Sequence, residues 1–256
     1  MSHPVFDIRG RVALVTGSSR GIGRALARGL LEAGCVVVLN GRDENVLTRT
    51  REELAELTGG SVHTRAFDVT EPDAVAEGIA QIEEHVGALD ILVNNAGVLH
   101  RAPFTEFSVE EWRRVLETNL SSAFIVGREV ARRMIPRGRG KIVNVCSVLS
   151  EVARPGIAPY SASKGGLKML TKGMCADLGP SGIQVNGLAP GYIDTDLTAA
   201  LIADEKFSSW LRTRTPVGRW GTVEDLVGAL IFLCSPASDF VGGQLLYADG
   251  GMLSVL

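Results

Sequence analysis

The sequence predicts an α/β protein whose doubly wound parallel sheet is covered by helices on both faces, and three observations support this prediction. Apolar runs of strand length alternate along the chain with stretches of helical periodicity. These runs are rich in Val, Ile and Leu and do not alternate with polar residues, which is typical of strands buried on both faces. Glycine makes up 30 of the 256 residues, well above the average of about 7%. Some part of the fold therefore requires backbone without side chains.

The elements follow in a regular order, with about seven strands and six helices. The expected strands are Val12–Thr16, Val36–Asn40, Val62–Phe67, Leu89–Asn94, Lys141–Cys146, Gln184–Leu188 and Gln244–Tyr247. The expected helices are Ile22–Ala33, Glu44–Leu57, Asp73–Val86, Val109–Met134, Tyr160–Leu178 and Val223–Leu233. Two of these helices begin with capping signals, because Ser108 precedes Glu111 and Thr222 precedes Asp225 by three residues.

The length and composition fit one domain spanning residues 1–256. With 45% hydrophobic and 21% charged residues, the chain has enough apolar material for a large core, which excludes disordered and fibrous proteins. One long region, residues 190–221, is irregular and interrupted by Pro216 and Gly218. We expect a loop-and-helix excursion there that acts as a lid over a substrate.

Charge and residue spacing exclude several classes of function. The formal net charge of −3 argues against nucleic-acid and membrane-surface partners. The longest apolar stretch, Leu226–Cys234, is too short to span a membrane, and the first ten residues lack a signal-peptide core, so we expect a soluble cytoplasmic protein. The four cysteines and four histidines have neither disulfide-framework nor zinc-ligand spacing, so no metal is expected.

The first predicted strand runs directly into TGSSRGIG, residues 16–23, and then into a helix. A glycine turn between a strand and a helix in the first βαβ unit is the geometry of a dinucleotide site in a Rossmann fold. Gly17 allows the tight turn, Gly21 lets the backbone approach a pyrophosphate, and Gly23 permits close packing of the helix on the strand. The helix N-terminus supplies N–H groups and a partial positive charge. The alternative is a tight turn without a ligand.

Five further patterns follow the glycine turn in order. They are Asn94-Asn95-Ala96-Gly97 after the fourth strand, Asn119 in the next helix, Ser147 after the fifth strand, Tyr160-x-x-x-Lys164, and Pro190-Gly191 after the sixth strand. Together with the spacing of the glycine turn, this order resembles the short-chain dehydrogenase/reductase family over nearly the whole chain. The resemblance implies an NAD(P)-dependent oxidoreductase that acts on CH–OH groups.

By the same resemblance, the cofactor lies along the ends of the strands. The positions implied to contact it, besides the three glycines, are Ser19, Arg20, Ile22, Asn40, Arg42, Asp68, Val69, Asn95, Ala96, Gly97, Tyr160, Lys164, Pro190, Gly191, Ile193 and Thr195. For Asp68 the alternative role is to cap a turn.

The end of the second strand favours NADP over NAD. A carboxylate there accepts from the ribose hydroxyls of NAD, whereas the 2′-phosphate of NADP requires cations. Gly41 stands where the family's acidic residue would be, Arg42 follows it, and Arg20 can reach the same phosphate from the first turn. NAD stays an alternative, because a small shift of register would offer Asp43 to a ribose.

Tyr160 and Lys164 are four residues apart and so lie on one face of a helix. With Ser147 and Asn119 they match the family's catalytic tetrad. Hydride transfer to a carbonyl builds negative charge on its oxygen, which requires a proton donor and a polarising hydrogen bond. The resemblance implies Tyr160 as acid/base, Ser147 as donor to the carbonyl oxygen, and Asn119 as holder of a water. We expect Lys164 to bind the ribose and to lower the tyrosine pKa, since an ammonium at about 4–6 Å contributes about 3–4 kcal/mol.

Segments outside these motifs resemble the gluconate 5-dehydrogenases of the family, which interconvert D-gluconate and 5-keto-D-gluconate. An open-chain sugar acid requires a cation for its carboxylate and acceptors for its hydroxyls. We expect Arg101, Glu151 and Arg154 to contact such a substrate beside Ser147 and Tyr160, although both arginines also fit exposed loop charges. The resembling segments are residues 98–107, 146–154, 162–178, 210–221 and 248–252.

Two other functions stay open. A 3-oxoacyl-thioester reductase of the same family would need a basic patch for an acidic carrier protein, and the only basic cluster found is Arg128, Arg132, Arg133, Arg137 and Arg139. The same cluster fits a solvated helix end. A non-enzymatic cofactor-binding regulator is disfavoured by the intact tetrad. The resemblance further implies a homotetramer built through the helices at 109–134 and 160–178 and the last strand.

Overall fold

The computed structural model describes residues 3–255 and has a seven-stranded parallel sheet at its centre. The strands are β1 (Val12–Val15), β2 (Val36–Gly41), β3 (Val62–Ala66), β4 (Leu89–Asn94), β5 (Gly140–Val145), β6 (Ile183–Pro190) and β7 (Leu245–Ala248). Their order is β3-β2-β1-β4-β5-β6-β7. The chain therefore starts in the middle of the sheet, adds β2 and β3 on one side of β1, and then adds β4 to β7 on the other side. Ligands of such sheets bind outside the strand ends where the order reverses, between β1 and β4. The predicted doubly wound Rossmann fold is confirmed.

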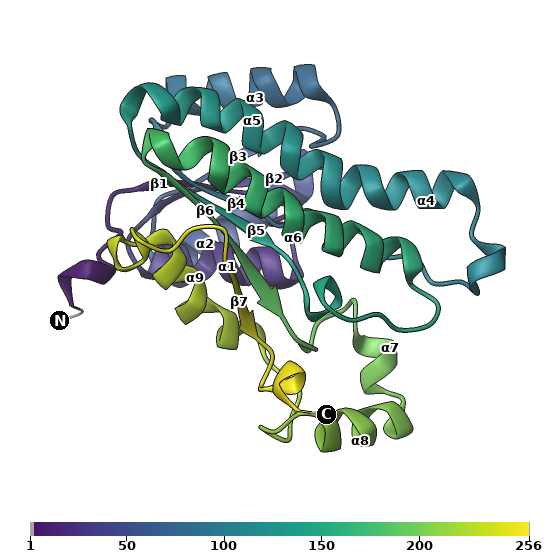
Figure 1. Cartoon of the computed structure of the whole chain (residues 1–256). Helices are drawn as coiled ribbons and strands as arrows, with labels where there is room; N and C mark the ends of the chain where they lie inside the picture. Colours follow the sequence, from purple (N-terminus) through teal and green to yellow (C-terminus); the bar gives the residue numbers. More distant parts are fainter. Residues whose placement is uncertain (1–2, 256) are drawn as a thin grey trace.

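Helices cover both faces of the sheet (Figure 1). Buried residues of α1, α2 and α9 pack on one face, and those of α3, α5 and α6 on the other. The helices are α1 (Gly21–Glu32), α2 (Glu44–Thr58), α3 (Pro72–His85), α4 (Val109–Leu116), α5 (Ser122–Met134), α6 (Ala158–Leu178), α7 (Ala199–Ile202), α8 (Glu205–Arg214) and α9 (Val227–Cys234). None of the helices within residues 3–255 has the length and apolar character needed to cross a membrane.

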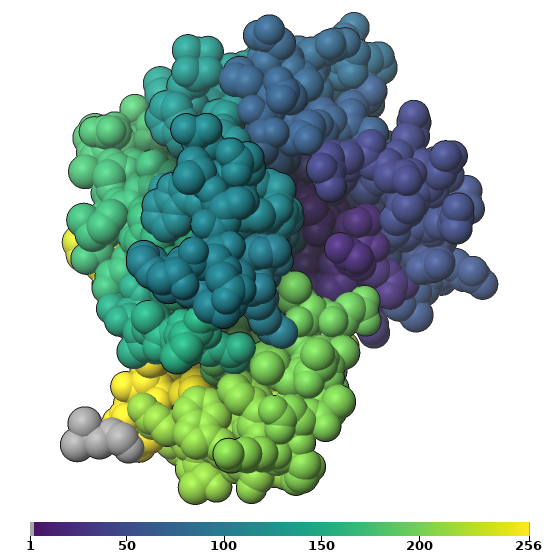
Figure 2. Space-filling view, turned by 90° about the vertical axis from the view of Figure 1, so that its right-hand side faces the viewer, coloured from purple at the N-terminus to yellow at the C-terminus, as the bar shows by residue number. Residues whose placement is uncertain are grey.

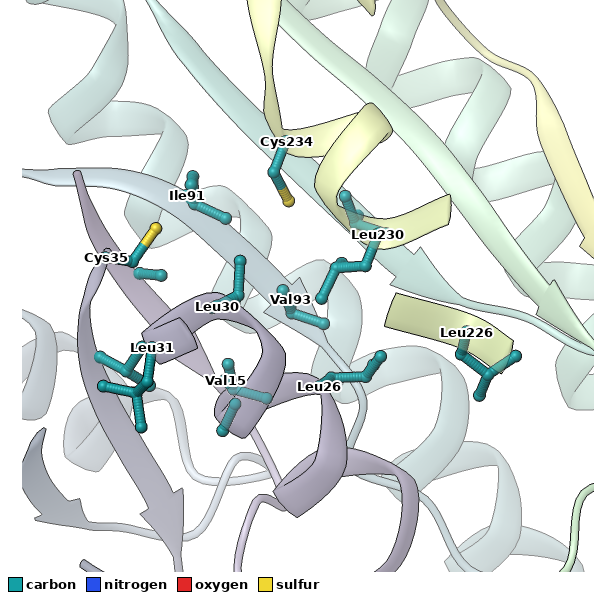
Figure 3. Close-up of a cluster of buried hydrophobic side chains, with 14 of the residues drawn as sticks. Val15, Leu26, Leu30, Leu31, Cys35, Ile91, Val93, Leu226, Leu230 and Cys234 are labelled. Atoms are coloured by element: carbon teal, nitrogen blue, oxygen red, sulfur yellow. The ribbon is translucent and has the colours of Figure 1, made fainter. Parts of the chain in front are cut away.

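Successive residues of a strand contribute to opposite layers of the core, because side chains alternate along a strand. In β1, Val15 packs under α1 and Leu14 packs under α3 and α5. Figure 3 shows the first layer, in which Leu26 and Leu30 of α1 lie between β1 and Leu230 of α9. Each fully buried side chain of this kind contributes about 1.5–3 kcal/mol. This packing holds the strand ends at fixed positions.

Two predicted helices differ in detail from the structure. The helix expected over 109–134 contains a π-helical turn at Glu117–Ser121 between α4 and α5. The helix expected over 223–233 begins as a 3₁₀ turn, Val223–Leu226, capped by Thr222 and Asp225. Side-chain periodicity does not identify either change, because each covers a single turn, which is too short to define a period of its own.

Residues 190–221, called here the excursion, leave the sheet at the end of β6 and contain α7 and α8, neither of which the sequence analysis placed. The ends of the excursion meet in an isolated parallel bridge between Ile193 and Gly221. Figure 1 shows α7 and α8 outside the carboxyl ends of β6 and β7. The excursion therefore borders the edge of the sheet where the predicted site residues lie.

Candidate active site

The glycine turn after β1 packs directly against the Asn-Asn-Ala-Gly turn after β4. Gly17 has a φ of +61°, and a Cβ there would lie 2.8 Å from the Cα of Ala96. A Cβ at Gly23 would lie 2.3 Å from Nδ2 of Asn95. Gly21, with a φ of +54°, has no described atom within 4 Å of its Cβ position, so its exposed side is open. Gly17 and Gly23 thus allow close packing, and Gly21 leaves the backbone accessible.

Short polar side chains hold these two turns together. The Thr16 hydroxyl accepts hydrogen bonds from the backbone N–H of Asn95 at 3.0 Å and of Ala96 at 3.1 Å. The Asn95 amide donates to the carbonyls of Thr16 at 2.9 Å and Gly17 at 3.0 Å. The Ser18 hydroxyl accepts from the backbone N–H of Asn40 at 3.0 Å. The sequence analysis missed Thr16 and Ser18, although both belong to the glycine-turn motif.

Two features of this region fit a bound dinucleotide. Helix α1 begins at Gly21, and its N-cap Arg20 makes no side-chain capping bond, so the first-turn N–H groups suit an anion. The Asn40 amide is buried and donates to the carbonyls of Arg65 and Phe67, but its Oδ1 has no partner within the described part of the chain. Buried polar atoms without a partner are rare and call for one. Glycines, N–H groups and this amide thus fit the phosphates and ribose of such a cofactor.

The end of β2 carries positive charge. The side chain of Arg42 is 80% exposed and lies 4.0 Å from the Asp68 carboxylate. Asp43 caps α2 by accepting from the backbone N–H of Val46 at 3.1 Å, so its carboxylate is already used. Asp68 accepts from the backbone N–H of Thr70 at 2.9 Å, which is the turn-capping role considered above. Asp43 is therefore poorly placed as an alternative ribose acceptor.

The structure brings Ser147, Tyr160 and Lys164 together beyond the end of β5. Ser147 follows this strand and caps the 3₁₀ turn Val148–Ser150, its hydroxyl accepting from the backbone N–H of Leu149 at 3.1 Å. Tyr160 and Lys164 lie on successive turns of α6. The Lys164 ammonium is buried, donates to the Val145 carbonyl at 2.7 Å, and lies 5.6 Å from the centre of the Tyr160 ring. The last residue of β5 thus fixes the lysine beside the tyrosine.

The acidity of Tyr160 differs from the sequence prediction. Burial raises the pKa of Tyr160 to about 12, while the neighbouring Ser147 hydroxyl acts in the opposite direction. Burial also lowers the pKa of Lys164. Burial disfavours the charged forms of both groups, so the net shift of the tyrosine pKa in this structure is upward, opposite to the expected lowering. The phenol is therefore protonated at neutral pH.

Asn119 lies in the π-helical turn between α4 and α5. Its amide oxygen accepts from the backbone N–H of Val98 at 2.7 Å, and its amide nitrogen donates to the Val98 carbonyl at 2.9 Å and to the Ser163 hydroxyl at 3.2 Å. Asn119 thus joins the segment after β4 to α6, which carries Tyr160. Its expected role in holding a water stays a prediction.

The segment that starts the excursion is tightly constrained. Pro190 ends β6, and a Cβ at Gly191 would lie 2.7 Å from the Cα of Asp249. Ile193 pairs with Gly221, and the backbone N–H of Thr195 donates to the Thr198 hydroxyl at 3.0 Å. These contacts hold the predicted cofactor-binding stretch at the end of β6.

The three expected substrate residues have different surroundings. A guanidinium nitrogen of Arg154 lies 3.5 Å from the Tyr192 hydroxyl. Burial and the positive charge of Arg154 lower the pKa of Arg101. The backbone N–H of Ala102 donates to the Gly156 carbonyl at 3.1 Å, so the two arginines lie on neighbouring segments. Glu151 instead forms an ion pair with Lys168 and accepts from the Tyr247 hydroxyl at 2.6 Å, joining α6 to β7. The structure therefore groups the two arginines and engages Glu151 elsewhere.

Figure 2 shows a hollow in the surface where the N-terminal part of the chain (purple), the segments around residue 110 (dark teal) and the excursion (light green) meet. Two aromatic side chains of the excursion that were not among the expected site residues, Tyr192 and Phe207, contact Arg154. Trp220 packs against both, and the three are called here the aromatic cluster. These three aromatic residues are irregularly spaced along the chain, so no sequence periodicity predicts that they meet.

Comparison with known proteins agrees with this geometry. The family model for short chain dehydrogenase matches residues 11–206. The chain is 57% identical to the gluconate 5-dehydrogenase of Gluconobacter oxydans, with 98% of each chain covered. It is 46% identical to the 5-keto-D-gluconate 5-reductase of Escherichia coli K12, again with 98% of each covered.

A solved structure is also similar to the whole chain. It is a gluconate 5-dehydrogenase from Burkholderia cenocepacia in complex with NADP and tartrate, with a TM-score of 0.96, 52% identity and 99% of each chain covered. The similarity therefore extends to fold and sequence together. The chain belongs to the short-chain dehydrogenase family and is an NAD(P)-dependent oxidoreductase acting on CH–OH groups, as its sequence predicts.

Proposed function

We propose that the protein is an NADP-dependent oxidoreductase that interconverts D-gluconate and 5-keto-D-gluconate. The observation that carries this proposal is a pair of arginines on neighbouring segments, Arg101 after β4 and Arg154 after Ser147, which have no carboxylate partner among residues 3–255. A keto acid supplies both a carbonyl for Tyr160 and a carboxylate for the arginines. The similarity to gluconate 5-dehydrogenases supports the same substrate.

NADP is the proposed cofactor, and it supplies or accepts the hydride. The glycine turn and the α1 N-terminus would hold its pyrophosphate, and Arg42 with Arg20 would bind its 2′-phosphate. Gly41 offers no carboxylate at the end of β2, and Asp43 is used as a helix cap. NADP in the similar Burkholderia cenocepacia structure supports this choice.

During reduction, residues of the chain would stabilise the negative charge on the carbonyl oxygen and supply the proton that it takes up. The Ser147 and Tyr160 hydroxyls donate hydrogen bonds to the carbonyl oxygen at C5, and the tyrosine proton passes to that oxygen as negative charge develops on it. The nearby Lys164 ammonium stabilises the resulting phenolate. Asn119 keeps α6 in register with the segment after β4. Oxidation of D-gluconate runs through the same positions in reverse.

Initial rates against a panel of substrates test this proposal. We expect NADPH to be oxidised with 5-keto-D-gluconate at a kcat/KM well above that with NADH, and above that of NADPH with acetoacetyl thioesters. Good turnover of the thioesters with none of 5-keto-D-gluconate would contradict the proposal and favour the carrier-protein reductase.

The basic cluster that such a reductase would use is largely paired with carboxylates. Arg137 lies 2.8 Å from Glu83, and Arg139 lies 3.5 Å from Asp90. Arg132 and Arg133 contact Glu129 at 3.2 and 3.4 Å. This pairing leaves little free positive charge for an acidic partner and favours the small-molecule substrate.

A homotetramer is part of the same proposal. Exposed apolar side chains lie on the helices and the C-terminal region expected to form its interfaces, including Phe124 on α5, Met169 on α6 and Phe240 before β7. Apolar side chains left exposed in one chain favour association. Light scattering coupled to gel filtration should give the mass of four chains, and a monomer mass would contradict it.

A further inference from the structure

We infer that Arg154 is a specificity-determining residue that selects a carboxylate over a neutral group on the substrate, and that the aromatic cluster of the excursion holds its guanidinium in place for this task. This inference rests on the proposed function. It concerns how the substrate's charge is recognised, not which bond reacts.

Arg154 links the catalytic loop to the excursion. It lies seven residues after Ser147, beyond the 3₁₀ turn Val148–Ser150. Its guanidinium carbon lies 5.2 Å from the centre of the Phe207 ring on α8, within the range of a cation–π contact. The same guanidinium reaches the Tyr192 hydroxyl at 3.5 Å, which is the outer limit of a hydrogen bond. One cation thus contacts both the start and the middle of the excursion.

The aromatic cluster is itself cross-linked. Tyr192 packs edge-on against Phe207 at 5.4 Å and against Trp220 at 5.9 Å between ring centres. The Trp220 indole N–H donates to the Ser208 hydroxyl at 3.2 Å, and that hydroxyl donates to the Ile202 carbonyl of α7 at 3.0 Å. Because residues from the start, middle and end of the excursion meet here, the ring under Arg154 has a fixed position.

The charge around Arg154 is not balanced. Two arginines of the neighbouring excursion have carboxylate partners, since Arg212 pairs with Glu205 at 2.6 Å and Arg219 with Asp225 at 2.6 Å. Arg154 and Arg101 have none among residues 3–255, and burial together with the positive charge of Arg154 lowers the pKa of Arg101. Two like charges close together raise the free energy of the site, and an anion between them removes that cost.

It follows that a carboxylate bound beside Arg154 gains favourable electrostatic free energy, whereas a neutral hydroxymethyl group does not. Arg154 would touch the substrate. Phe207 and Tyr192 would act as positioning residues, because they restrict the guanidinium without reaching the reacting atoms. A free arginine on a mobile loop would bind the same anion with a larger loss of side-chain entropy.

A matched pair of substrates tests the inference. D-Glucitol is D-gluconate with the carboxylate replaced by a hydroxymethyl group, so the ratio of kcat/KM for the two alcohols with NADP⁺ measures charge selectivity alone. Arg154→Met keeps the length and apolar contact of the side chain but removes its charge. We expect this variant to lower the ratio by about 10- to 100-fold, mainly through a higher KM for D-gluconate.

Two further variants locate the effect. Phe207→Leu should lower the ratio less, by about 3- to 10-fold, because the charge remains but its support is lost. Arg212→Met removes an exposed, paired cation from the same helix, α8, and should leave the ratio unchanged. An equal loss of kcat/KM for both alcohols in Arg154→Met would overturn the inference while leaving the proposed function intact.

Binding gives a readout independent of turnover. In a Trp112→Phe background the remaining tryptophans are Trp210 and Trp220, both of which pack against Phe207. We expect D-gluconate, but not D-glucitol, to change their fluorescence, and Arg154→Met to abolish the change. A response to D-gluconate without its oxidation would support the inference and overturn the proposed reaction. Identical responses to both alcohols would overturn the inference.

Discussion

The proposed cofactor side and the proposed substrate side of the site are held together by different kinds of contact. On the cofactor side, glycines allow two turns to pack closely, and short side chains such as Thr16 and Asn95 join the turns through hydrogen bonds to the backbone. On the substrate side, long side chains such as Arg154 and Phe207 meet across segments distant in sequence. The first arrangement tolerates almost no change, whereas the second can vary without disturbing the sheet. Changes on one side should therefore leave the property of the other side unaffected.

The largest effect should come from the tyrosine between the two sides. Tyr160→Phe removes the proton donor but keeps the ring, so we expect kcat for reduction to fall by about 10³-fold with NADPH binding unchanged. Stopped-flow rates and a fluorescence titration of NADPH measure the two quantities. Retention of more than a tenth of the wild-type kcat would show that another group supplies the proton.

The pH dependence follows from the raised pKa of Tyr160, about 12 in this structure. Reduction uses the protonated phenol and should be level through neutral pH. Oxidation of D-gluconate uses the phenolate. While the pH stays below the pKa, each unit of pH increase makes the phenolate about tenfold more abundant, so the oxidation rate should rise from pH 7 toward pH 9. Rate profiles in both directions check the sign, and an oxidation rate that falls over this range would contradict it.

The cofactor side should respond next most strongly to the loss of one charge. Arg42→Ala should raise the KM for NADPH by about 10- to 100-fold and leave that for NADH nearly unchanged, because only NADPH carries the 2′-phosphate. Arg49→Ala is the matched control, because it removes an exposed arginine that lies on α2, away from the end of β2. The ratio of D-gluconate to D-glucitol oxidation should stay constant in both. Equal weakening of both cofactors would remove the argument for NADP.

The smallest expected effect concerns the packing of the glycine turn. A Cβ at Gly23 would lie 2.4 Å from the Gly17 carbonyl oxygen, a backbone atom that cannot move freely. Gly23→Ala should therefore lower the free energy of unfolding by about 1–3 kcal/mol in urea. Gly173→Ala on the exposed side of α6, where no described atom lies within 4 Å, should raise it by about 0.4–1 kcal/mol. Equal stability of the two variants would contradict this packing.

The same contrast explains what could be predicted from the sequence. Tyr160, Lys164 and the three glycines form local patterns, because their spacing along one turn or helix sets their geometry. The contact of Glu151 with Tyr247 joins residues 96 positions apart, and no local pattern predicts it. Helix α8 escaped prediction although Asp204 caps it, since its exposed face is highly polar and it precedes Pro216.

The effect of burial on the pKa of Tyr160 was also not predicted from the sequence. The charge argument for Tyr160 and Lys164 correctly placed the two side chains but omitted the desolvation of both, which reverses the direction of the tyrosine pKa shift. The π-helical turn that positions Asn119 likewise could not be predicted, because it is a single turn of five residues inside a longer helical stretch.

The most direct test of the account identifies the product of the reaction. Reduction of 5-keto-D-gluconate with NADPH creates a new stereocentre at C5, and ¹³C NMR distinguishes D-gluconate from its C5 epimer. We expect D-gluconate as the product, formed with one NADPH consumed per molecule. Formation of the C5 epimer, or no product at all, would contradict the proposed function.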